Sequence, residues 1–329
     1  MGAARRRGHQ PPRPGLVRAL RVRRGADAGG VAAWSALWFP ERHRDDARAF
    51  RAGRGHVSAE VTPRFVVEAL VDANGVADLG RVYDVAVALG IGEQPVRLAI
   101  RRMITTGDAE QQGRGRRGTL HLNPAARVRD RHDVAFVHHA YRQDAGEAPW
   151  DGAWRLCAFS VPEARRATRD TLRATLVRLG GAALGPGLYV SAHDWDALID
   201  AETADTDGAG LLTRATTSDL RVGDLRDPHA IAARLWPARP VLAAYRPLAA
   251  LLDNVAAGGA DAWGSDEPGR IALALRLAVA FDHALVTDPL LPPELRPAPW
   301  PPTELRARFR AVWATVADEE GSARLYTRY

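Results

Sequence analysis

Three short amphipathic helical patterns follow one another within residues 63–107, and this run limits the possible folds more than any other feature of the chain. The first, RFVVEALVDAN, carries an apolar stripe and stops at an Asn-Gly pair. The second, DLGRVYDVAVALG, has Asp78 in the N-cap position and ends at Gly90. The third, EQPVRLAIRRMITTG, places Pro95 in the first turn and ends at Gly107. The pattern predicts three consecutive short helices.

A glycine- and arginine-rich segment, DAEQQGRGRRGTLHLNP, follows the third helical pattern. It reads as two short strand-like pieces that flank a basic tip. Three short helices and a basic hairpin within about 60 residues is the element order of a winged helix-turn-helix. The sequence therefore predicts a winged-helix DNA-binding domain over residues 60–124.

The third predicted helix has two chemically different faces. At about 100° per residue, one face carries Val96, Ala99, Ile100 and Met103, and the opposite face is mostly polar. Arginine can bond bidentately to guanine, and glutamine to adenine, in the major groove. A solvated charged face would look similar, but the adjacent basic hairpin favours DNA. The candidate DNA-binding residues are Gln94, Arg97, Arg101, Arg102 and Thr105 on the helix, beside Leu98, and Arg114, Arg116 and Arg117 at the hairpin tip.

We expect a division of labour among these arginines. Arg97 and Arg101 are predicted to read bases, whereas the three hairpin arginines are predicted to hold phosphates.

The net charge of +6 is unevenly distributed along the chain. All 45 basic residues are arginine, and residues 1–59 carry a net charge of +9, residues 60–131 +2 and residues 132–329 −5. The first segment is rich in Arg, Pro and Gly without a sustained period, so we predict a disordered basic head. The placement of the charge, more than its total, indicates where an anionic partner would bind.

A second unit begins near residue 150. An apolar run ended by Pro162 predicts a buried strand, ARRATRDTLRATLVRLGG predicts a helix, and GLYVSA a second strand, which together suggest a small α/β sandwich. Helical patterns resume from Pro228 and are interrupted by DPLLPPELRPAPWPP, whose prolines forbid a continuous helix. The expected segments are a head (1–59), a DNA-binding domain (60–124), a linker helix (125–149), a central α/β domain (150–223) and a helical C-terminal domain (224–329). The predicted class is α+β with several domains.

Several functional classes lack a signal in this sequence. No run of about 18 apolar residues and no export signal occur, so a cytoplasmic protein without a membrane span is expected. The single cysteine, Cys157, is predicted to be a small core residue. The histidines at 132, 138 and 139 lack metal-ligand spacing, and His193-Asp194-Trp195-Asp196 is a weak metal candidate. We expect no metal, no cofactor and no catalytic residue, and hence no enzyme.

Residues 150–195 combine several features in a fixed order: a strand with Trp-Asp-Gly and Trp-Arg, a Pro-Glu pair, an Arg-rich helix and a return strand. Their sequence is WDGAWRLCAFSVPEARRATRDTLRATLVRLGGAALGPGLYVSAHDW. In these features it resembles the PaaX family of transcriptional repressors of phenylacetate catabolism. The late DPLLPPELRPAPWP is similar to the family in the same order, so the resemblance covers about residues 60–320. The matching positions of the first stretch are Trp150, Asp151, Gly152, Trp154, Arg155, Pro162, Glu163, Arg169, Asp170, Leu172, Leu179, Gly180, Gly187, Leu188 and Ser191.

The resemblance implies a homodimeric repressor that binds an inverted-repeat DNA operator. It also implies a ferredoxin-like central domain and release of the operator by phenylacetyl-CoA or a related aryl-acyl-CoA. Departures from the family pattern at residues 119–121 and 281–284 leave open another acyl-CoA, or no CoA ligand. Candidate contacts for the CoA phosphates are Arg155, Arg165, Arg166 and Arg169, whose alternative is a solvated helix face paired with Glu163 and Asp170.

Two other functional classes stay open at this stage. The central unit also resembles, in fold, a small CRISPR-associated metal-dependent nuclease, which places an Asp at the end of its first strand. Here that strand ends in Ala158-Phe159-Ser160, and the first carboxylate is Glu163. The third class is a scaffold that uses its winged helix for protein contacts.

Overall fold

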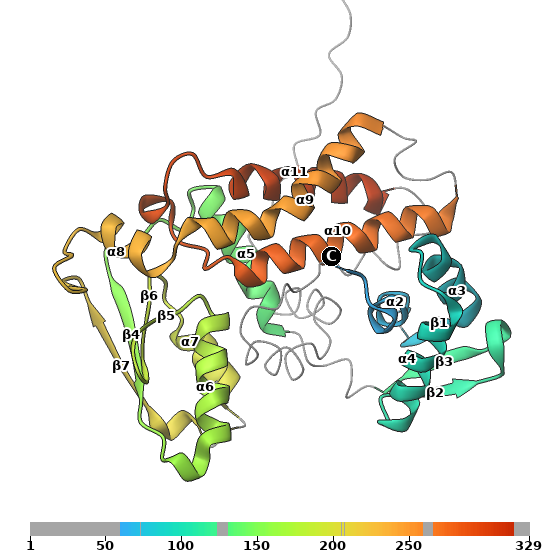
Figure 1. Cartoon of the computed structure of the whole chain (residues 1–329), viewed down its shortest axis with the longest axis horizontal. Helices are drawn as coiled ribbons and strands as arrows, with labels where there is room; N and C mark the ends of the chain where they lie inside the picture. The colour runs from blue at the N-terminus through green and yellow to red at the C-terminus, as the bar shows by residue number, and fades with distance from the viewer. Residues whose placement is uncertain are drawn as a thin grey trace, which may run out of the picture.

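The computed structural model describes residues 60–123, 131–258 and 266–318, apart from 73, 205 and 207. In this part of the chain the fold is α+β, with helices and two antiparallel sheets (Figure 1). The predicted basic head, residues 1–59, lies outside the described residues.

The N-terminal region contains the three helices and the hairpin in the expected order. Its elements are α2 (Pro63–Ala69), β1 (Val76–Asp78), α3 (Leu79–Ala88), α4 (Glu93–Thr105), β2 (Ala109–Gln112), the 3-10 helix η2 (Gly115–Arg117) and β3 (Thr119–Leu122), with sheet order β1-β3-β2. Asp78 caps α3, because its side chain accepts the backbone N–H of Arg81 at 2.8 Å. Gly90 and Gly107, with φ of 78° and 76°, follow the ends of α3 and α4.

The first helix is shorter than its sequence pattern predicts. It ends at Ala69, not at the Asn-Gly pair, because the Asp72 carboxylate accepts the backbone N–H groups of Asn74 and Val76. This turn leads directly into β1, which pairs with β3. A strand of three residues was not predicted, since so short a segment shows no period.

The N-terminal region shares one hydrophobic core with the last three C-terminal helices, α9 (Ala238–Gly258), α10 (Glu267–Thr287) and α11 (Pro301–Asp318). These helices follow α8 (Pro228–Leu235). Val82 of α3 and Leu275 of α10 belong to the same buried cluster, and Arg81 forms a 2.6 Å ion pair with Glu267 at the start of α10. Figure 1 shows α10 running from the α3 end of the molecule toward the central domain.

The central unit is a four-stranded antiparallel sheet with two helices. Its elements are β4 (Trp154–Phe159), α6 (Arg166–Arg178), β5 (Ala182–Gly185), β6 (Leu188–Ser191), α7 (Asp196–Thr203) and β7 (Leu212–Thr217). The strand order β5-β6-β4-β7 and the sequence β-α-β-β-α-β are those of a ferredoxin-like sandwich. The predicted strand, helix and return strand are present, and β5 and α7 are additions that the sequence reading missed.

The two faces of this sheet belong to different clusters. Cys157 packs with Leu176 of α6 and Ile199 of α7, so the prediction of a core cysteine is confirmed. Burial raises the pKa of its thiol to about 11. On the opposite face, Trp154 stacks on Trp236 with ring centroids 6.1 Å apart.

Two further segments connect the units. The helix α5 (Arg131–Asp144) precedes the central domain. The proline-rich stretch after α10 contains only the 3-10 helix η7 (Pro293–Leu295), in agreement with the prediction that it cannot be a continuous helix. Of the helices in the described ranges, none combines the length and apolar character needed to cross a bilayer.

Candidate functional site

The helix α4 presents a polar face to solvent. Val96, Ile100 and Met103 are buried, which fixes the rotation of the helix. All five candidate residues on this helix are therefore exposed, as their spacing predicts: Gln94, Arg97, Arg101, Arg102 and Thr105. The structure thus brings these side chains together on one surface of the N-terminal region.

The arginines of α4 differ in their partners. Arg97 is ion-paired with Glu93, one turn earlier on the same helix. Neither Arg101 nor Arg102 forms an ion pair within the described residues. These two guanidinium groups are consequently the ones on α4 that are available for an external anion.

The hairpin tip is attached to the helices by Arg116. Its guanidinium pairs with Asp84 of α3 and lies 3.6 Å from the carboxylate of Glu93, and it also stacks 5.7 Å from the centroid of the Tyr83 ring. These contacts hold the tip against α3 and α4. Arg114 and Arg117, on either side of Arg116, are exposed and have no ion pair within the described residues.

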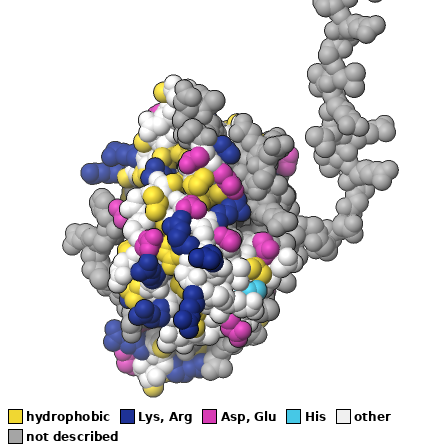
Figure 2. Space-filling model, turned by 90° about the vertical axis from the view of Figure 1, so that its right-hand side faces the viewer, with side chains coloured by type: hydrophobic (Ala, Val, Ile, Leu, Met, Phe, Trp, Pro, Cys, Tyr) yellow, Lys and Arg dark blue, Asp and Glu magenta, His cyan; other side chains and the backbone are white. Residues whose placement is uncertain are grey.

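Figure 2 views the molecule from the end that carries α3, α4 and the hairpin. Arginine side chains gather over the middle and lower part of this face, and apolar side chains lie among them. A surface that combines cations with some apolar groups is suited to a polyanion that also offers apolar contacts.

A second cluster of charged side chains is buried where α5, α9, α10 and α11 meet. Arg306, which is 0% exposed, donates to both carboxylate oxygens of Asp144 at 2.6 and 2.7 Å. It also donates to Asp288 at 2.9 Å and to the hydroxyl of Tyr245 at 2.7 Å. We call Asp144, Tyr245, Asp288, Arg296 and Arg306 the buried junction. Burial opposes ionisation of Asp144, but the hydrogen bonds from Arg306 outweigh it, so the pKa of this carboxyl is lowered.

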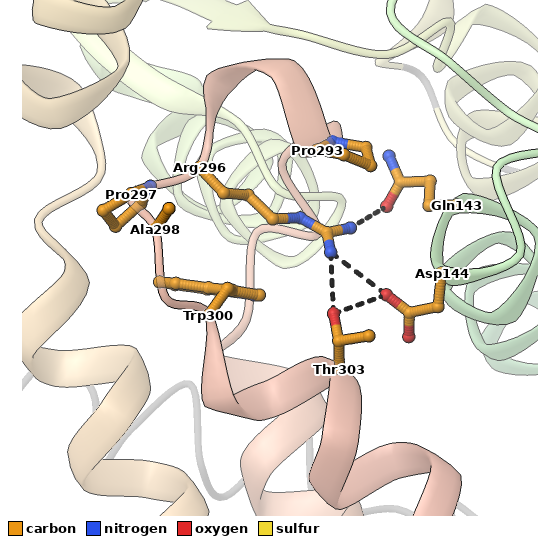
Figure 3. A pocket seen from close by; sticks show the side chains of 8 residues that line it. All are labelled: Gln143, Asp144, Pro293, Arg296, Pro297, Ala298, Trp300 and Thr303. Atoms are coloured by element: carbon orange, nitrogen blue, oxygen red, sulfur yellow. Dashed lines mark hydrogen bonds and ion pairs between the residues drawn. The ribbon is translucent and has the colours of Figure 1, made fainter.

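Arg296 connects the buried junction to a small pocket (Figure 3). It donates to Asp144 at 3.0 Å, to Gln143 at 3.0 Å and to Thr303 at 3.1 Å. The pocket has a volume of about 240 Å³, and Trp300, Pro297 and Ala298 lie across it from Gln143 and Asp144. Its lining residues are Gln143, Asp144, Pro293, Arg296, Pro297, Ala298, Trp300 and Thr303.

Two histidines meet at the contact between α5 and the central domain. The rings of His139 and His193 lie edge to face with centroids 5.2 Å apart, so His139 packs against the central domain. Burial, together with the smaller effects of His139, Arg155 and Arg296, lowers the pKa of His193 to about 3. Asp194, next in the chain, is exposed, whereas His193 is buried.

The four arginines suggested as effector contacts do not form one cluster. Arg155 lies at the start of β4 and is ion-paired with Asp151, whereas the other three follow the far end of that strand. Arg169 pairs with Glu163 at 2.6 Å, and Arg166 lies 4.0 Å from Asp170. This is the paired, solvated helix face named above as the alternative for Arg166 and Arg169.

No metal centre is found in the parts of the chain that the structure describes. Those residues contain no group of three or more His, Cys, Asp or Glu side chains able to hold an ion. Glu163, the first carboxylate after β4, is engaged by Arg169. No observation therefore favours the nuclease alternative.

Residues 147–230 match the family model described as the PaaX protein central Cas2-like domain. This chain carries the PaaX central domain. The match confirms the resemblance that the sequence suggested at residues 150–195, and its range contains the whole β4–β7 sheet. The PaaX central domain of this chain also includes the start of α8, whose Ile231 packs in the cluster on the Trp154 side of the sheet.

The assignment does not depend on the other two comparisons. The uncharacterized protein Rv0674 from Mycobacterium tuberculosis is similar to this chain with 23% sequence identity, over 81% of this chain and 98% of that chain, at a TM-score of 0.47. The comparison with curated proteins finds no match.

The sequence reading missed the acids that hold the arginines and the whole of the buried junction. Asp84 and Glu93 belong to no motif of the sequence, and only the fold shows that they pair with Arg116. The members of the buried junction come from four separate segments, so no local pattern joins them. One sequence signal could have indicated a buried arginine, because Arg306 lies in an apolar stripe with Leu305 and Phe309.

Proposed function

We propose that this protein is a sequence-specific DNA-binding transcription regulator, and that residues 60–124 form its winged helix-turn-helix domain with α4 as the recognition helix. The observation that carries the proposal is the exposed face of α4, on which Arg101 and Arg102 have no ion pair within the described residues and lie beside a basic hairpin. Family resemblance through the PaaX central domain supports the same class of function.

The contacts of the arginines suggest which of them bind bases and which bind phosphates. Arg101 and Arg102 are the candidates for contacts in the major groove, and Arg114 and Arg117 for contacts with phosphates. Arg97 and Arg116 are already paired with Glu93 and Asp84, so they would have to exchange these partners before they could bind DNA. We therefore assign Arg116 chiefly to holding the hairpin tip.

Selection from a random-sequence duplex library with the full chain tests this proposal. We expect one sequence to be enriched and to be protected by the protein in a footprint. Because the proposed protein is a homodimer, the enriched sequence should be an inverted repeat with half-sites about one helical turn, or a multiple of it, apart. Recovery of unrelated sequences after repeated rounds would contradict sequence-specific binding and favour the scaffold alternative.

We further propose that the regulator represses an aromatic-acid catabolic operon and is released by an aryl-acyl-CoA. The pocket beside Arg296 supports a site for a ligand at the buried junction, since Trp300 offers an aromatic surface beside polar groups. Its volume of about 240 Å³ suits the acyl part of such a ligand better than the whole molecule. For release, the ligand must bind the DNA-free form more tightly.

An operator-release assay tests the proposed effector. The selected duplex is bound by the protein and then titrated with phenylacetyl-CoA, with other aryl- and alkyl-CoA thioesters and with CoA alone. We expect release by an aryl-acyl thioester and not by CoA alone. Retention of the duplex with every thioester would contradict the effector while leaving DNA binding intact.

A further inference from the structure

Leu98 is an exposed leucine at the centre of the outward face of α4. Leu98 is 45% exposed, whereas the three buried apolar residues of α4 lie on the opposite face of the helix. At about 100° per residue, Gln94, Leu98, Arg101 and Thr105 fall within a sector of about 60°. Leu98 is therefore surrounded by the side chains that the proposed function assigns to DNA.

The position of Leu98 separates it from the other exposed apolar residues. The exposed large hydrophobic residues among those described are Val87, Leu98, Ile104, Val177 and Val286. Ile104, also on α4, lies about 100° away from the centre of the outward face. Single exposed apolar side chains need no explanation in general, but one in the middle of a face bearing unpaired arginines would be buried by any ligand of that face.

We propose that Leu98 contacts the 5-methyl group of a thymine and so selects a T·A base pair in each half-site. This inference rests on the proposed function, because it takes α4 to be the helix that enters the major groove. Among the groups that the edges of the four base pairs present in that groove, the thymine methyl is the apolar one. A leucine that faces the bases between hydrogen-bonding side chains is thus complementary to thymine.

Replacement of thymine by deoxyuridine tests this contact, because it removes the methyl group and leaves base pairing unchanged. The duplex selected by the full chain from a random library is resynthesised with one thymine at a time replaced, and each Kd is measured. We expect one thymine per half-site at which the replacement weakens binding about four-fold, the value for burial of one methyl group. At the remaining thymines the Kd should be unchanged.

Two variants assign the effect to its side chain. Leu98→Ala should bind the thymine and deoxyuridine duplexes equally, and alanine at this exposed helical position keeps the helix stable. Ile104→Ala is the matched control, since Ile104 is 40% exposed on the same helix but faces another direction, and it should retain the four-fold difference.

The outcomes separate this inference from the function on which it depends. A selected duplex that binds equally well with deoxyuridine at every position would overturn the contact and leave DNA recognition standing. The contact is also wrong if Leu98→Ala keeps the full difference between the two duplexes. Failure to enrich any sequence would overturn both the contact and the proposed function.

Discussion

At the scale of single residues, arginine has two distinct uses in this protein. Arg306 and Arg296 are buried and fully engaged by carboxylates and neutral acceptors, whereas Arg101 and Arg117 remain exposed and unpaired within the described residues. The sequence shows only that all of these are arginines. Which of them are structural depends on Asp144, Asp288 and Glu93, and the fold brings those acids near.

Removal of the Arg306 guanidinium should strongly destabilise the fold. In Arg306→Met the carboxylates of Asp144 and Asp288 would stay buried without their cation, at a cost of about 3–5 kcal/mol in the free energy of unfolding. Urea denaturation measures this loss. Arg308→Met is the control two residues further along α11, where the pair with Asp253 is largely exposed and its loss should cost about 1 kcal/mol or less. Equal losses in the two variants would contradict the role of the buried junction.

His193 should make the stability depend on pH. Its pKa is lowered to about 3 in the folded chain, so between that value and the ordinary 6.5 the unfolded chain binds a proton that the folded chain does not. The free energy of unfolding should therefore fall as the pH is lowered from 7.5 to 5, and His193→Leu should reduce this fall. Urea midpoints at the two pH values measure the effect, with His138→Leu, at an exposed position of α5, as the control. A fall of the same size in His193→Leu would contradict the account.

At the scale of elements, the sequence predicts helices better than short strands. The lengths of α3 and α4 follow from their apolar periods and from Asp78, Gly90 and Gly107, all of which act locally. In contrast, β1 and β5 have three and four residues and exist because β3 and β6 lie beside them. The partner of β1 is distant in the chain, whereas β5 pairs with β6 directly after it, but both strands are too short to show a period of their own.

The turn between β5 and β6 should tolerate no side chain at Gly187. Its φ is +71°, and a Cβ there would lie 2.4 Å from the carbonyl oxygen of Phe159. Gly187→Ala should lower the free energy of unfolding by about 1–3 kcal/mol. At the end of β5, a Cβ at Gly185 would meet no atom within 4 Å, so Gly185→Ala is the matched control. Thermal unfolding compares them, and equal stability of the two variants would show that the close approach is absent.

At the scale of the whole molecule, the proposed DNA-binding region and the C-terminal helices form one packed unit. The helix α10 is about 30 Å long at 1.5 Å per residue. It is contacted by α3 near its start, and Asp288 at its C-cap belongs to the buried junction. A ligand that rearranged the contacts of Asp144 would therefore act on the end of a helix whose other end supports α3. The sequence predicts the order of the N-terminal elements but not this shared core, because its two parts are far apart in the chain, as Arg81 and Glu267, 186 positions apart, show.

The most direct test of the central claim is the ratio of two affinities, for the selected duplex and for a scrambled duplex of equal length. If α4 reads bases, Arg101→Ala should lower this ratio by about five-fold or more, since a good bidentate contact contributes about 1–3 kcal/mol of discrimination. Arg114→Ala, the phosphate-contact control, should weaken both duplexes alike and keep the ratio. An unchanged ratio in Arg101→Ala would contradict sequence reading by this face of α4.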